Sequence, residues 1–360
     1  MNKLYKILIH FVAFRLRFIV FSFLILGGCK KSSDFITKWK KVNSLYTGYI
    51  ADFCFISKDT GFVLGAYIAQ NGNTVIQKTF DGGENWVTDT ILTGEKKSHI
   101  TTLAYYNHVL YAGGFIPGAS TMNRTYSSTD YGHSWKIIDT TFIRGANMIF
   151  LNSADILLSS FTGIYKSTNG GNSFKQVYSD PLNLGFSIIQ FPDQNTGFAG
   201  GGISFDGNSI STMAKTTDGG NSWMNITSTA LPKIITMQFF NNNKAYVFVY
   251  DVKGDISHTT YSDYKLFHTT DGANTWNLIR DHFQSDFGNI TSSYFKDENN
   301  GYISTEKSIF STLDGGRNWI KEFDAGSVIS QGIILSGLYS PPSNHLFAFS
   351  TDGSIYKRLE

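Results

Sequence analysis

The sequence has few cysteines, few prolines and few charged residues for its length. Its 360 residues include two cysteines and six prolines, and 16% of the chain is charged. Two cysteines cannot make a disulfide-rich scaffold, and six prolines with non-periodic glycine exclude a collagen-like or low-complexity chain. Because 41% of the residues are apolar, intrinsic disorder is excluded as well. The length fits two ordinary domains or one large all-β domain.

Long hydrophobic runs are also missing, and the one short run lies near the N-terminus. Residues 18–26 are apolar apart from Ser22, two arginines precede them, and two glycines and Cys29 follow. A membrane-spanning helix needs about 20 apolar residues. A basic region, a short apolar region and small residues, in this order, are typical of a secretory signal. The sequence therefore predicts a signal peptide over residues 1–28.

The end of this segment, Leu26-Gly27-Gly28-Cys29, resembles a bacterial lipobox, in which the cysteine receives the lipid. The alternative is an ordinary signal peptide followed by a chance cysteine. The lipobox predicts lipid attachment at Cys29 and a lipidated tether over 29–38. It also predicts secretion across the inner membrane and anchoring to a bacterial membrane, at the outer membrane or cell surface. Cys54 is then left alone in an apolar stretch, as an inert core thiol.

Charge of one sign is not in excess once the signal peptide is removed. The whole chain has a net charge of +2, but its first 28 residues hold four cations and no acid. The remaining chain has 26 basic and 28 acidic side chains, without a basic stripe of the kind that binds nucleic acid. We therefore expect no nucleic-acid partner, and contact with a membrane only through the lipid.

Aromatic residues, in contrast, make up 15% of the chain, which favours strands because aromatic side chains suit a half-buried pleated surface. One pattern, Ser/Thr-x-Asp-Gly-x-x-x-Trp, recurs six times at intervals of 39 to 53 residues. Its Asp and Trp positions hold Asp81 and Trp86, Asp130 and Trp135, Asn169 and Phe174, Asp218 and Trp223, Asp271 and Trp276, and Asp314 and Trp319. A period of this length, with several short strands per unit, is typical of a β-propeller.

Each copy of the pattern, called a box below, has the chemistry of a turn between two strands. The Asp or Asn side chain can accept hydrogen bonds from backbone N–H groups ahead of it. The glycines permit positive φ, and the Trp can pack between sheets. We therefore expect the box aspartates to be structural. Tyr131 and Ala273 replace single glycines, and their turns should be the least strained at that position or the least regular.

Each box lies within a longer unit of four predicted strands, which corresponds to one propeller blade. The last unit lacks its Trp strand and has strands only over 332–339, 345–350 and 354–359. Asp352-Gly353 lies in a turn between two of these strands and is not a seventh box. The missing strand is found at residues 39–42, which begin with Trp39. We predict an all-β fold over residues 39–360, a seven-bladed β-propeller of four-stranded antiparallel blades. The N-terminal strand closes the last blade, because this pairing removes both open edges.

The boxes resemble the Asp-box, or bacterial neuraminidase repeat, which also occurs in sialidases, sortilin-like receptors and some glucanases. The whole unit is more specific. A strand that follows Asn-x-Gly-aromatic, as at residues 195–198, and a strand ending in Thr-x-Asp-Gly-Gly-x-x-Trp, as at 216–223, resemble the photosystem II stability/assembly factor family. The resemblance implies a seven-bladed propeller over essentially all of 39–360 that binds a partner protein. It does not identify the partner.

Enzymes that share the box need residues that this sequence lacks. A sialidase binds the substrate carboxylate with three arginines, whereas the mature chain has five arginines in all and no Arg-Ile-Pro motif. Asp-box glucanases place paired carboxylates between two propellers, and one propeller offers one wall. Gly-x-Ser-x-Gly, P-loop and His-Glu-x-x-His motifs are absent, and the histidines are not spaced as metal ligands. We predict no enzymatic activity, no cofactor and no bound metal.

The predicted function is binding of a protein partner by a monomeric, lipid-anchored propeller. The alternative is a glycan-binding or glycoside-hydrolase-like surface protein. An acid/base carboxylate pair in the central channel would favour the alternative, and a broad apolar rim would favour the protein partner.

Only parts that break the repeat can distinguish one ligand from another, so the loops should carry the site. Connections between the second and third strands are longest over 67–73, 115–123, 202–209 and 251–264. Together with the linkers between blades, they form a candidate rim centred on blade five. Its residues are Phe115, Met122, Arg144, Phe205, Asp206, Asp255, His258, Tyr261 and His282.

Overall fold

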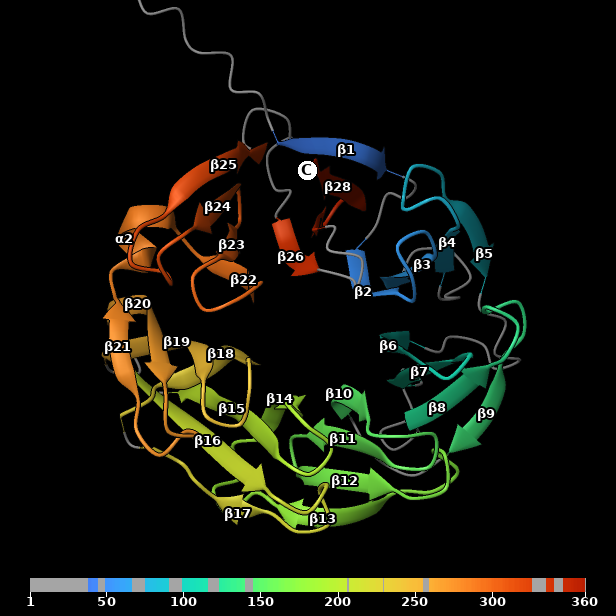
Figure 1. The fold of residues 1–360 in the computed structure, drawn as a ribbon, viewed down its shortest axis with the longest axis horizontal. Coiled ribbons are helices and arrows are strands. Elements are labelled where there is room, and N and C mark those ends of the chain that lie inside the picture. Colours follow the sequence, from blue (N-terminus) through green and yellow to red (C-terminus); the bar gives the residue numbers. More distant parts are fainter. Residues whose placement is uncertain are drawn as a thin grey trace, which may run out of the picture. The chain divides into compact units, whose positions relative to one another are not determined.

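The computed structural model describes residues 38–44, 49–66, 75–90, 99–115, 123–139, 145–205, 207–228, 230–254, 259–325, 335–339 and 346–359. The predicted signal peptide, Cys29 and all of the tether except Lys38 lie outside these ranges. In the unit that begins at Lys38, the strands form seven four-stranded antiparallel sheets. The sheets follow one another around a central axis (Figure 1). The predicted all-β, seven-bladed propeller is confirmed.

Each of blades one to six runs from its inner to its outer strand in chain order (Figure 1). Blade one contains β2 (Tyr49–Phe55), β3 (Gly61–Ala66), β4 (Val75–Thr79) and β5 (Val87–Thr90). Blade two contains β6 (His99–Tyr106), β7 (Val109–Phe115), β8 (Asn123–Ser128) and β9 (Lys136–Asp139). Blade three contains β10 (Gly145–Phe150), β11 (Ile156–Ser160), β12 (Gly163–Ser167) and β13 (Lys175–Ser179).

Blade four contains β14 (Phe186–Gln190), β15 (Gly197–Phe205), β16 (Asn208–Thr216) and β17 (Met224–Asn225). Blade five contains β18 (Lys233–Phe239), β19 (Ala245–Gly254), β20 (Thr259–Thr269) and β21 (Asn277–Arg280), and the short helix α2 (Phe283–Phe287) follows it. Blade six contains β22 (Ile290–Phe295), β23 (Gly301–Thr305), β24 (Ser308–Thr312) and β25 (Ile320–Asp324). Blade seven contains β26 (Leu335–Tyr339), β27 (Phe347–Ser350), β28 (Ser354–Arg358) and β1 (Trp39–Ser44).

Blade seven is closed by the two ends of the propeller chain. Strand β1 pairs with β28 from Trp39 opposite Arg358 to Ser44 opposite Ser354. The Leu359 N–H also donates to the carbonyl oxygen of Lys38 at 2.6 Å. The predicted closure by the N-terminal strand is therefore confirmed, and it supplies the outer strand that the last unit lacks.

The hydrophobic core is divided among the interfaces between neighbouring blades. Between blades four and five, for example, buried Phe198 and Met213 pack with Ile234, Met237 and Val247. Full burial of one such side chain stabilises the fold by about 1.5–3 kcal/mol. The ring therefore depends on every interface, including the one that β1 completes.

The box turns share one hydrogen-bond pattern, shown by the turn around Asp218. Thr216 Oγ1 donates to Asp218 Oδ1 at 2.7 Å, and Ser222 N–H donates to the same oxygen at 2.9 Å. The N–H of Gly219 donates to the carbonyl oxygen of Asn195 in the turn before β15, at 2.8 Å. This last bond couples the box to the Asn-x-Gly turn. The two sequence patterns therefore occur together because one turn fixes the other.

The turns with Tyr131 and Ala273 correct one expectation. Both residues have positive φ, 56° and 70°, in the region that favours glycine, so these positions are not the least strained. The turn with Ala273 keeps the hydrogen bonds of the other boxes, because Thr269 Oγ1 and the Thr275 N–H donate to Asp271 Oδ1 at 2.8 and 2.9 Å, so the expected irregularity is limited to its Trp. Trp276 Nε1 is buried without a hydrogen-bond partner among the described residues, whereas Trp223 Nε1 donates to the carbonyl oxygen of Gly220 at 3.3 Å.

Two connections expected to be long loops are instead extended strands. In blade four, β15 and β16 stay paired through Phe205 opposite Asn208, so most of 202–209 is a hairpin. In blade five, β19 and β20 stay paired through Gly254 opposite Thr259, which covers most of 251–264. The polar composition of these segments was misleading, because a two-stranded ribbon that projects from a blade has polar residues on its solvated surface.

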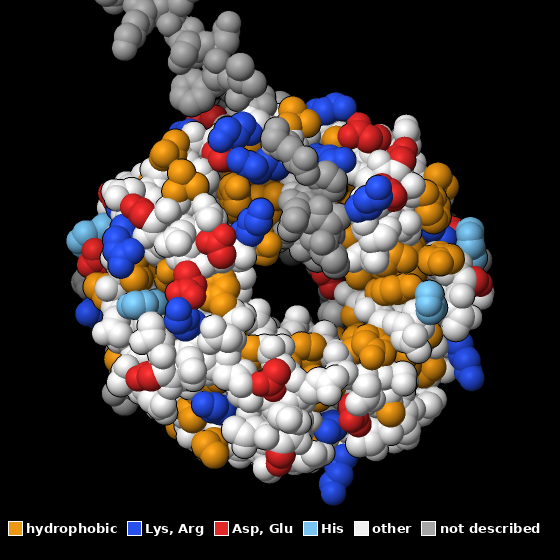
Figure 2. Space-filling view, in the orientation of Figure 1, with side chains coloured by type: hydrophobic (Ala, Val, Ile, Leu, Met, Phe, Trp, Pro, Cys, Tyr) orange, Lys and Arg blue, Asp and Glu red, His pale blue; other side chains and the backbone are white. Residues whose placement is uncertain are grey.

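The surface of one face of the ring carries charges of both signs. Figure 2 shows them dispersed around a central opening, with hydrophobic side chains between them. In the part of the chain that the structure covers, no helix is both long and apolar enough to cross a membrane.

Candidate binding face of the propeller

The candidate rim residues fall into three groups. Met122, Arg144, Asp206, Asp255 and His258 lie outside the described residues. Phe115 ends β7 and Tyr261 lies in β20. Phe205, at the tip of β15, has 72% of its surface exposed, and His282 precedes α2. Phe205 of blade four and His282 after blade five are therefore the rim residues whose surroundings can be described.

The hairpins of blades four and five support each other. The N–H of Val252 in β19 donates to Ser209 Oγ in β16 at 3.0 Å. At the tips, a Cβ added to Gly207 would lie 2.1 Å from the carbonyl oxygen of Gly254, so the two backbones touch there. Ser204 Oγ and Ser209 Oγ are 2.8 Å apart on the side of the blade-four hairpin that faces blade five. Small polar residues allow this close contact.

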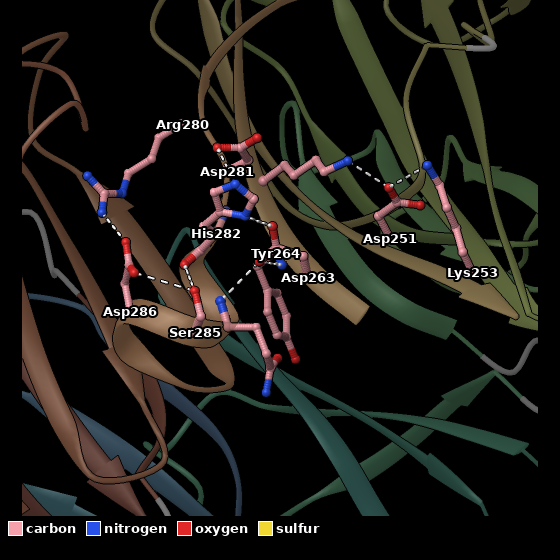
Figure 3. Close-up of polar contacts among 11 residues, drawn as sticks. Asp251, Lys253, Asp263, Tyr264, Arg280, Asp281, His282, Ser285 and Asp286 are labelled. Atoms are coloured by element: carbon pink, nitrogen blue, oxygen red, sulfur yellow. Dashed lines mark hydrogen bonds and ion pairs between the residues drawn. The ribbon is translucent and has the colours of Figure 1, made fainter. Parts of the chain in front are cut away.

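The blade-five hairpin places two acids opposite each other, Asp251 and Asp263 (Figure 3). Both are buried, and like charges opposite each other destabilise a sheet unless they are compensated. Lys265 Nζ donates to Asp251 Oδ2 at 2.7 Å, and Lys253 Nζ lies 3.9 Å from the same oxygen. The charge of Asp251 is thus compensated from within the hairpin.

Asp263 also fixes the start of α2. Its carboxylate accepts hydrogen bonds from the backbone N–H groups of His282 at 2.6 Å and Gln284 at 3.0 Å (Figure 3). Arg280, just before the helix, forms an ion pair with Asp286. The His282 side chain is 67% exposed, and its Nδ1 lies 3.7 Å from Asp263 Oδ2. The predicted centre at blade five is therefore a compensated charge cluster that holds the hairpin to its linker.

The blade-four hairpin differs, because its other side is apolar and exposed. Opposite residues of an antiparallel pair lie on one face, and faces alternate along each strand. Ile203 is opposite Ile210, and Phe205 is two residues further along, so these three side chains share a face. Gly201 and Thr212 share it too. The exposed fractions of Ile203, Phe205 and Ile210 are 36%, 72% and 49%.

This apolar face looks towards blade three, which the contacts at its base establish. Thr212 Oγ1 donates to Asp180 Oδ1, in the linker after blade three, at 3.0 Å. A Cβ added to Gly201 would lie 2.2 Å from the carbonyl oxygen of Gly185. The linker 180–185 therefore packs against the hairpin backbone just below Ile203 and Ile210.

Blade three has no projecting hairpin beside this linker. Its second and third strands are joined by only Phe161 and Thr162. Phe161 is 65% exposed and Leu182, in the linker, is 47% exposed. A Cβ added to Gly185 would lie 2.8 Å from the Cα of Phe161, so the turn and the linker are in contact. We call this surface the apolar step. Its wall is Ile203, Phe205 and Ile210, and its floor is Phe161 and Leu182.

Sequence reasoning found Phe205 but missed the other four residues of the apolar step. The available signal was the alternation of Ile203 and Phe205 with Gly202 and Ser204, which predicts a strand with one apolar face. The exposure of Phe161 and Leu182 depends on the lengths of neighbouring connections, which the sequence of one blade does not contain.

A catalytic carboxylate pair, which would favour the glycan-active alternative, is expected in the central channel. Among the described inner strands, Asp52 in β2 is the single acidic residue. Burial raises the pKa of Asp52 to about 6, although hydrogen bonds from Leu103 and Phe53 oppose the shift. Cys54, nearby in β2, is buried, and burial raises the pKa of its thiol to about 12. No group of three metal-ligating side chains occurs in the part of the chain described.

No family model and no curated protein matches the chain. Among solved structures, YCF48 from Cyanidioschyzon merolae superposes with a TM-score of 0.66 at 17% identity, covering 89% of this chain and 98% of that one. The propeller is similar to YCF48. A structure of YCF48 bound to D1 peptide gives a TM-score of 0.63 at 14% identity, covering 90% of this chain and 95% of that one.

A GH74 xyloglucanase from Xanthomonas campestris gives a TM-score of 0.60 at 14% identity. The match covers 89% of this chain and 54% of the enzyme, so this chain spans about half of the enzyme's length. At these identities the likenesses show the fold alone. The seven-bladed fold fits the photosystem II assembly factor-like family that the sequence resembles.

Proposed function

We propose that this protein is a non-catalytic propeller that binds a protein partner through the apolar step, while a lipid on Cys29 holds it at a bacterial membrane. The observation that carries the proposal is the exposure of five large apolar side chains on neighbouring segments, namely the blade-four hairpin, the blade-three turn and the linker that contacts both. A contiguous exposed apolar patch on a soluble domain is typical of a protein interface. Phe, in particular, is enriched at interface cores.

Two further observations support a protein rather than a glycan. The described inner strands contribute one acid, Asp52, where a glycoside hydrolase needs a pair. One similar structure was solved as YCF48 bound to D1 peptide, which is a precedent for a peptide ligand on this fold. The likeness to a GH74 xyloglucanase makes a glycan the competing ligand, and the experiment below includes it.

The test is capture of partners from native membranes by the full-length, membrane-anchored protein, followed by crosslinking and mass spectrometry. The double variant Phe205→Ser/Ile210→Ser should reduce the recovery of specific partners at least tenfold. Ile320→Ser, at a 64% exposed position on the outer strand of blade six, is the matched control and should leave recovery unchanged.

Two outcomes would contradict the proposal. Equal recovery with the double variant and the wild type would exclude the apolar step as the site. Binding or hydrolysis of xyloglucan by the wild type, lost in Asp52→Asn, would favour the glycan-active alternative instead.

A further inference from the structure

We propose that the apolar step takes an extended, uncharged segment of the partner, which adds to the inner edge of β15 as an extra strand. This rests on the proposed function, because it specifies how the same surface would be occupied. It is carried by different observations: the strand register of blade four and the distribution of charge around the step.

The first observation is a free strand edge. Strand β14 pairs with β15 only as far as Phe186 opposite Gly201. Beyond that point, residues 202–205 pair with β16 alone among the described strands. The inner edge of this part of β15 therefore presents backbone groups that no described strand covers. Such an edge is a template for adding another strand.

The register also shows which backbone groups face this edge. Two residues connect Phe205 to Asn208, and in a two-residue hairpin the closing pair exchanges both of its hydrogen bonds. Hydrogen-bonded and non-hydrogen-bonded pairs then alternate along the ladder. Ile203 and Phe205 thus direct their N–H and C=O groups to β16, whereas Gly202 and Ser204 direct theirs to the free edge.

The second observation concerns the side chains. A strand added at this edge continues the sheet, so alternate side chains of the added strand lie on the same face as Ile203 and Phe205. That face is the wall of the apolar step, and Phe161 and Leu182 lie at its foot. A partner with apolar residues at every second position would therefore bury them in the step while its backbone pairs with Gly202 and Ser204.

Charge explains why the segment should be uncharged. In 180–185 and 201–212 the two charged residues are Asp180 and Asp206, and Asp206 lies outside the described residues. Asp180 is 2% exposed. Its carboxylate accepts hydrogen bonds from the N–H groups of Leu184 at 2.7 Å and Gly185 at 2.8 Å, in addition to the bond from Thr212. Among the described residues of these two segments, a charge brought into the step would lose water without gaining a counter-charge.

The hairpin of blade five has a similar free edge but lacks the apolar side chains that would bind an apolar strand. Its hairpin projects in the same way, and β18 pairs with β19 only as far as Lys233 opposite Tyr250. Along the projecting part, however, β19 has Asp251 and Lys253, where β15 has Ile203 and Phe205. The blade-five edge is therefore bordered by charge, and an apolar strand would not gain burial there.

The experiment measures fluorescence anisotropy of a labelled peptide against the full-length protein in detergent. The probe is an uncharged heptapeptide of alternating threonine and valine, with acetylated and amidated ends. Ser204→Pro removes one N–H from the free edge, and proline is tolerated on a strand edge. Ser204→Ala is the matched control, because it loses the same hydroxyl but keeps the N–H. The peptide should bind the wild type and Ser204→Ala alike and bind Ser204→Pro at least tenfold more weakly.

The outcomes separate this inference from the proposed function. Equal affinity of Ser204→Pro and Ser204→Ala, or equal affinity for a peptide with lysine and glutamate in place of valine, would overturn strand addition. So would the absence of wild-type binding at millimolar peptide. Partner capture that is lost in Phe205→Ser/Ile210→Ser but kept in Ser204→Pro would leave the proposed function intact.

Two other possible occupants of the apolar step, a second copy of the chain and a lipid surface, are tested with related variants. If the wild type dimerises in a concentration-dependent way and Phe205→Ser abolishes this, the step belongs to a second copy of the chain. If the protein with Cys29→Ser binds phosphatidylcholine vesicles and Phe205→Ser abolishes this, a lipid surface covers it. Either result would overturn the inference.

Discussion

Asp52 Oδ2 accepts a hydrogen bond from the backbone N–H of Leu103 at 2.7 Å, so a carboxylate joins the inner strands of blades one and two. Two other interfaces use neutral amides for this purpose. Gln190 Oε1 accepts the Phe239 N–H at 2.9 Å between blades four and five, and Gln238 makes the equivalent bond between blades five and six. Of these three contacts, the one between blades one and two is therefore the contact whose acceptor, Asp52, can be protonated.

The pH dependence of stability should reveal this carboxylate. Because burial raises the pKa of Asp52 from 3.8 to about 6, the folded protein binds this proton more tightly than the unfolded chain does. The contribution of this group to the free energy of unfolding should decrease, by on the order of 2 kcal/mol, as the pH rises from about 4 to about 6. Urea denaturation of the wild type and Asp52→Asn at pH 4, 5, 6 and 7 measures it. The difference between the two proteins should change over this window, and parallel curves would contradict the assignment.

The box aspartates should stabilise the fold without taking part in binding. Asp218→Ala removes the acceptor for Thr216 and Ser222 and should lower the free energy of unfolding by about 0.5–2 kcal/mol, as loss of a capping side chain does. Asp218→Asn should retain most of the stability, because Asn169 makes the same bond to Ser173 N–H in the third box, at 3.0 Å. Urea denaturation and partner capture test this together. Unchanged stability with lost capture would contradict a structural role.

The carboxylates of these boxes should make the protein less stable in strong acid, because their pKa values are lowered in the folded state. Hydrogen bonds from the hydroxyl and then the N–H of Thr275 lower the pKa of Asp271 to about 2. A carboxyl group with a lowered pKa contributes stability above its unfolded value, and the contribution is lost as the pH falls through its folded value. The opposite signs for Asp52 and Asp271 are the reason that single variants are needed to separate them.

Closure of the ring should depend strongly on Trp39. Its side chain is 3% exposed and packs in the cluster of Phe323, Leu335 and Tyr356. Trp39→Ala should reduce the free energy of unfolding by about 3–5 kcal/mol, as large aromatic truncations in cores do. Lys40→Ala, at an exposed position of the same strand, should have an effect below about 0.5 kcal/mol. A melting temperature of Trp39→Ala equal to that of the wild type would show that β1 is dispensable.

Lipid attachment remains a prediction of the sequence. Cells that express the wild-type chain should incorporate labelled palmitate into it, and cells that express Cys29→Ser should not. Incorporation at equal levels would mean that Leu26-Gly27-Gly28-Cys29 is not a lipobox. Cys54 provides the internal control, because it is buried and its replacement by alanine should not change the label.

The blade number, the closure and the box turns could be predicted because each repeats a local pattern. Asp218 accepts hydrogen bonds within its own turn, Gly219 bonds to the Asn-x-Gly turn of the same blade, and the repeat places this pair of turns in each blade that has a box. The candidate site was predicted less well. The segment after Asp251 is polar, which favoured a loop, whereas cross-strand pairing and compensation by Lys265 keep it extended.

The apolar step and the Asp52 contact escaped prediction for a different reason. Phe161 is exposed because its own blade has a short turn beside a long hairpin, and Asp52 meets Leu103 because two inner strands are neighbours across a blade interface. Both are relations between blades. A repeat pattern read one unit at a time does not contain them.

The pairing of Trp39 with Arg358 also determines when the ring can be completed. Translation produces β1 first and its partner β28 last, so β1 has no partner until the whole propeller has been made. Contacts between residues this far apart in the chain form slowly, because the entropy of closing the loop is lost before any contact is gained. We therefore expect closure to be the last event of folding. Until it occurs, the strand edges that β1 will protect are open to other chains, so we expect the chain to be most prone to aggregation just before the ring closes.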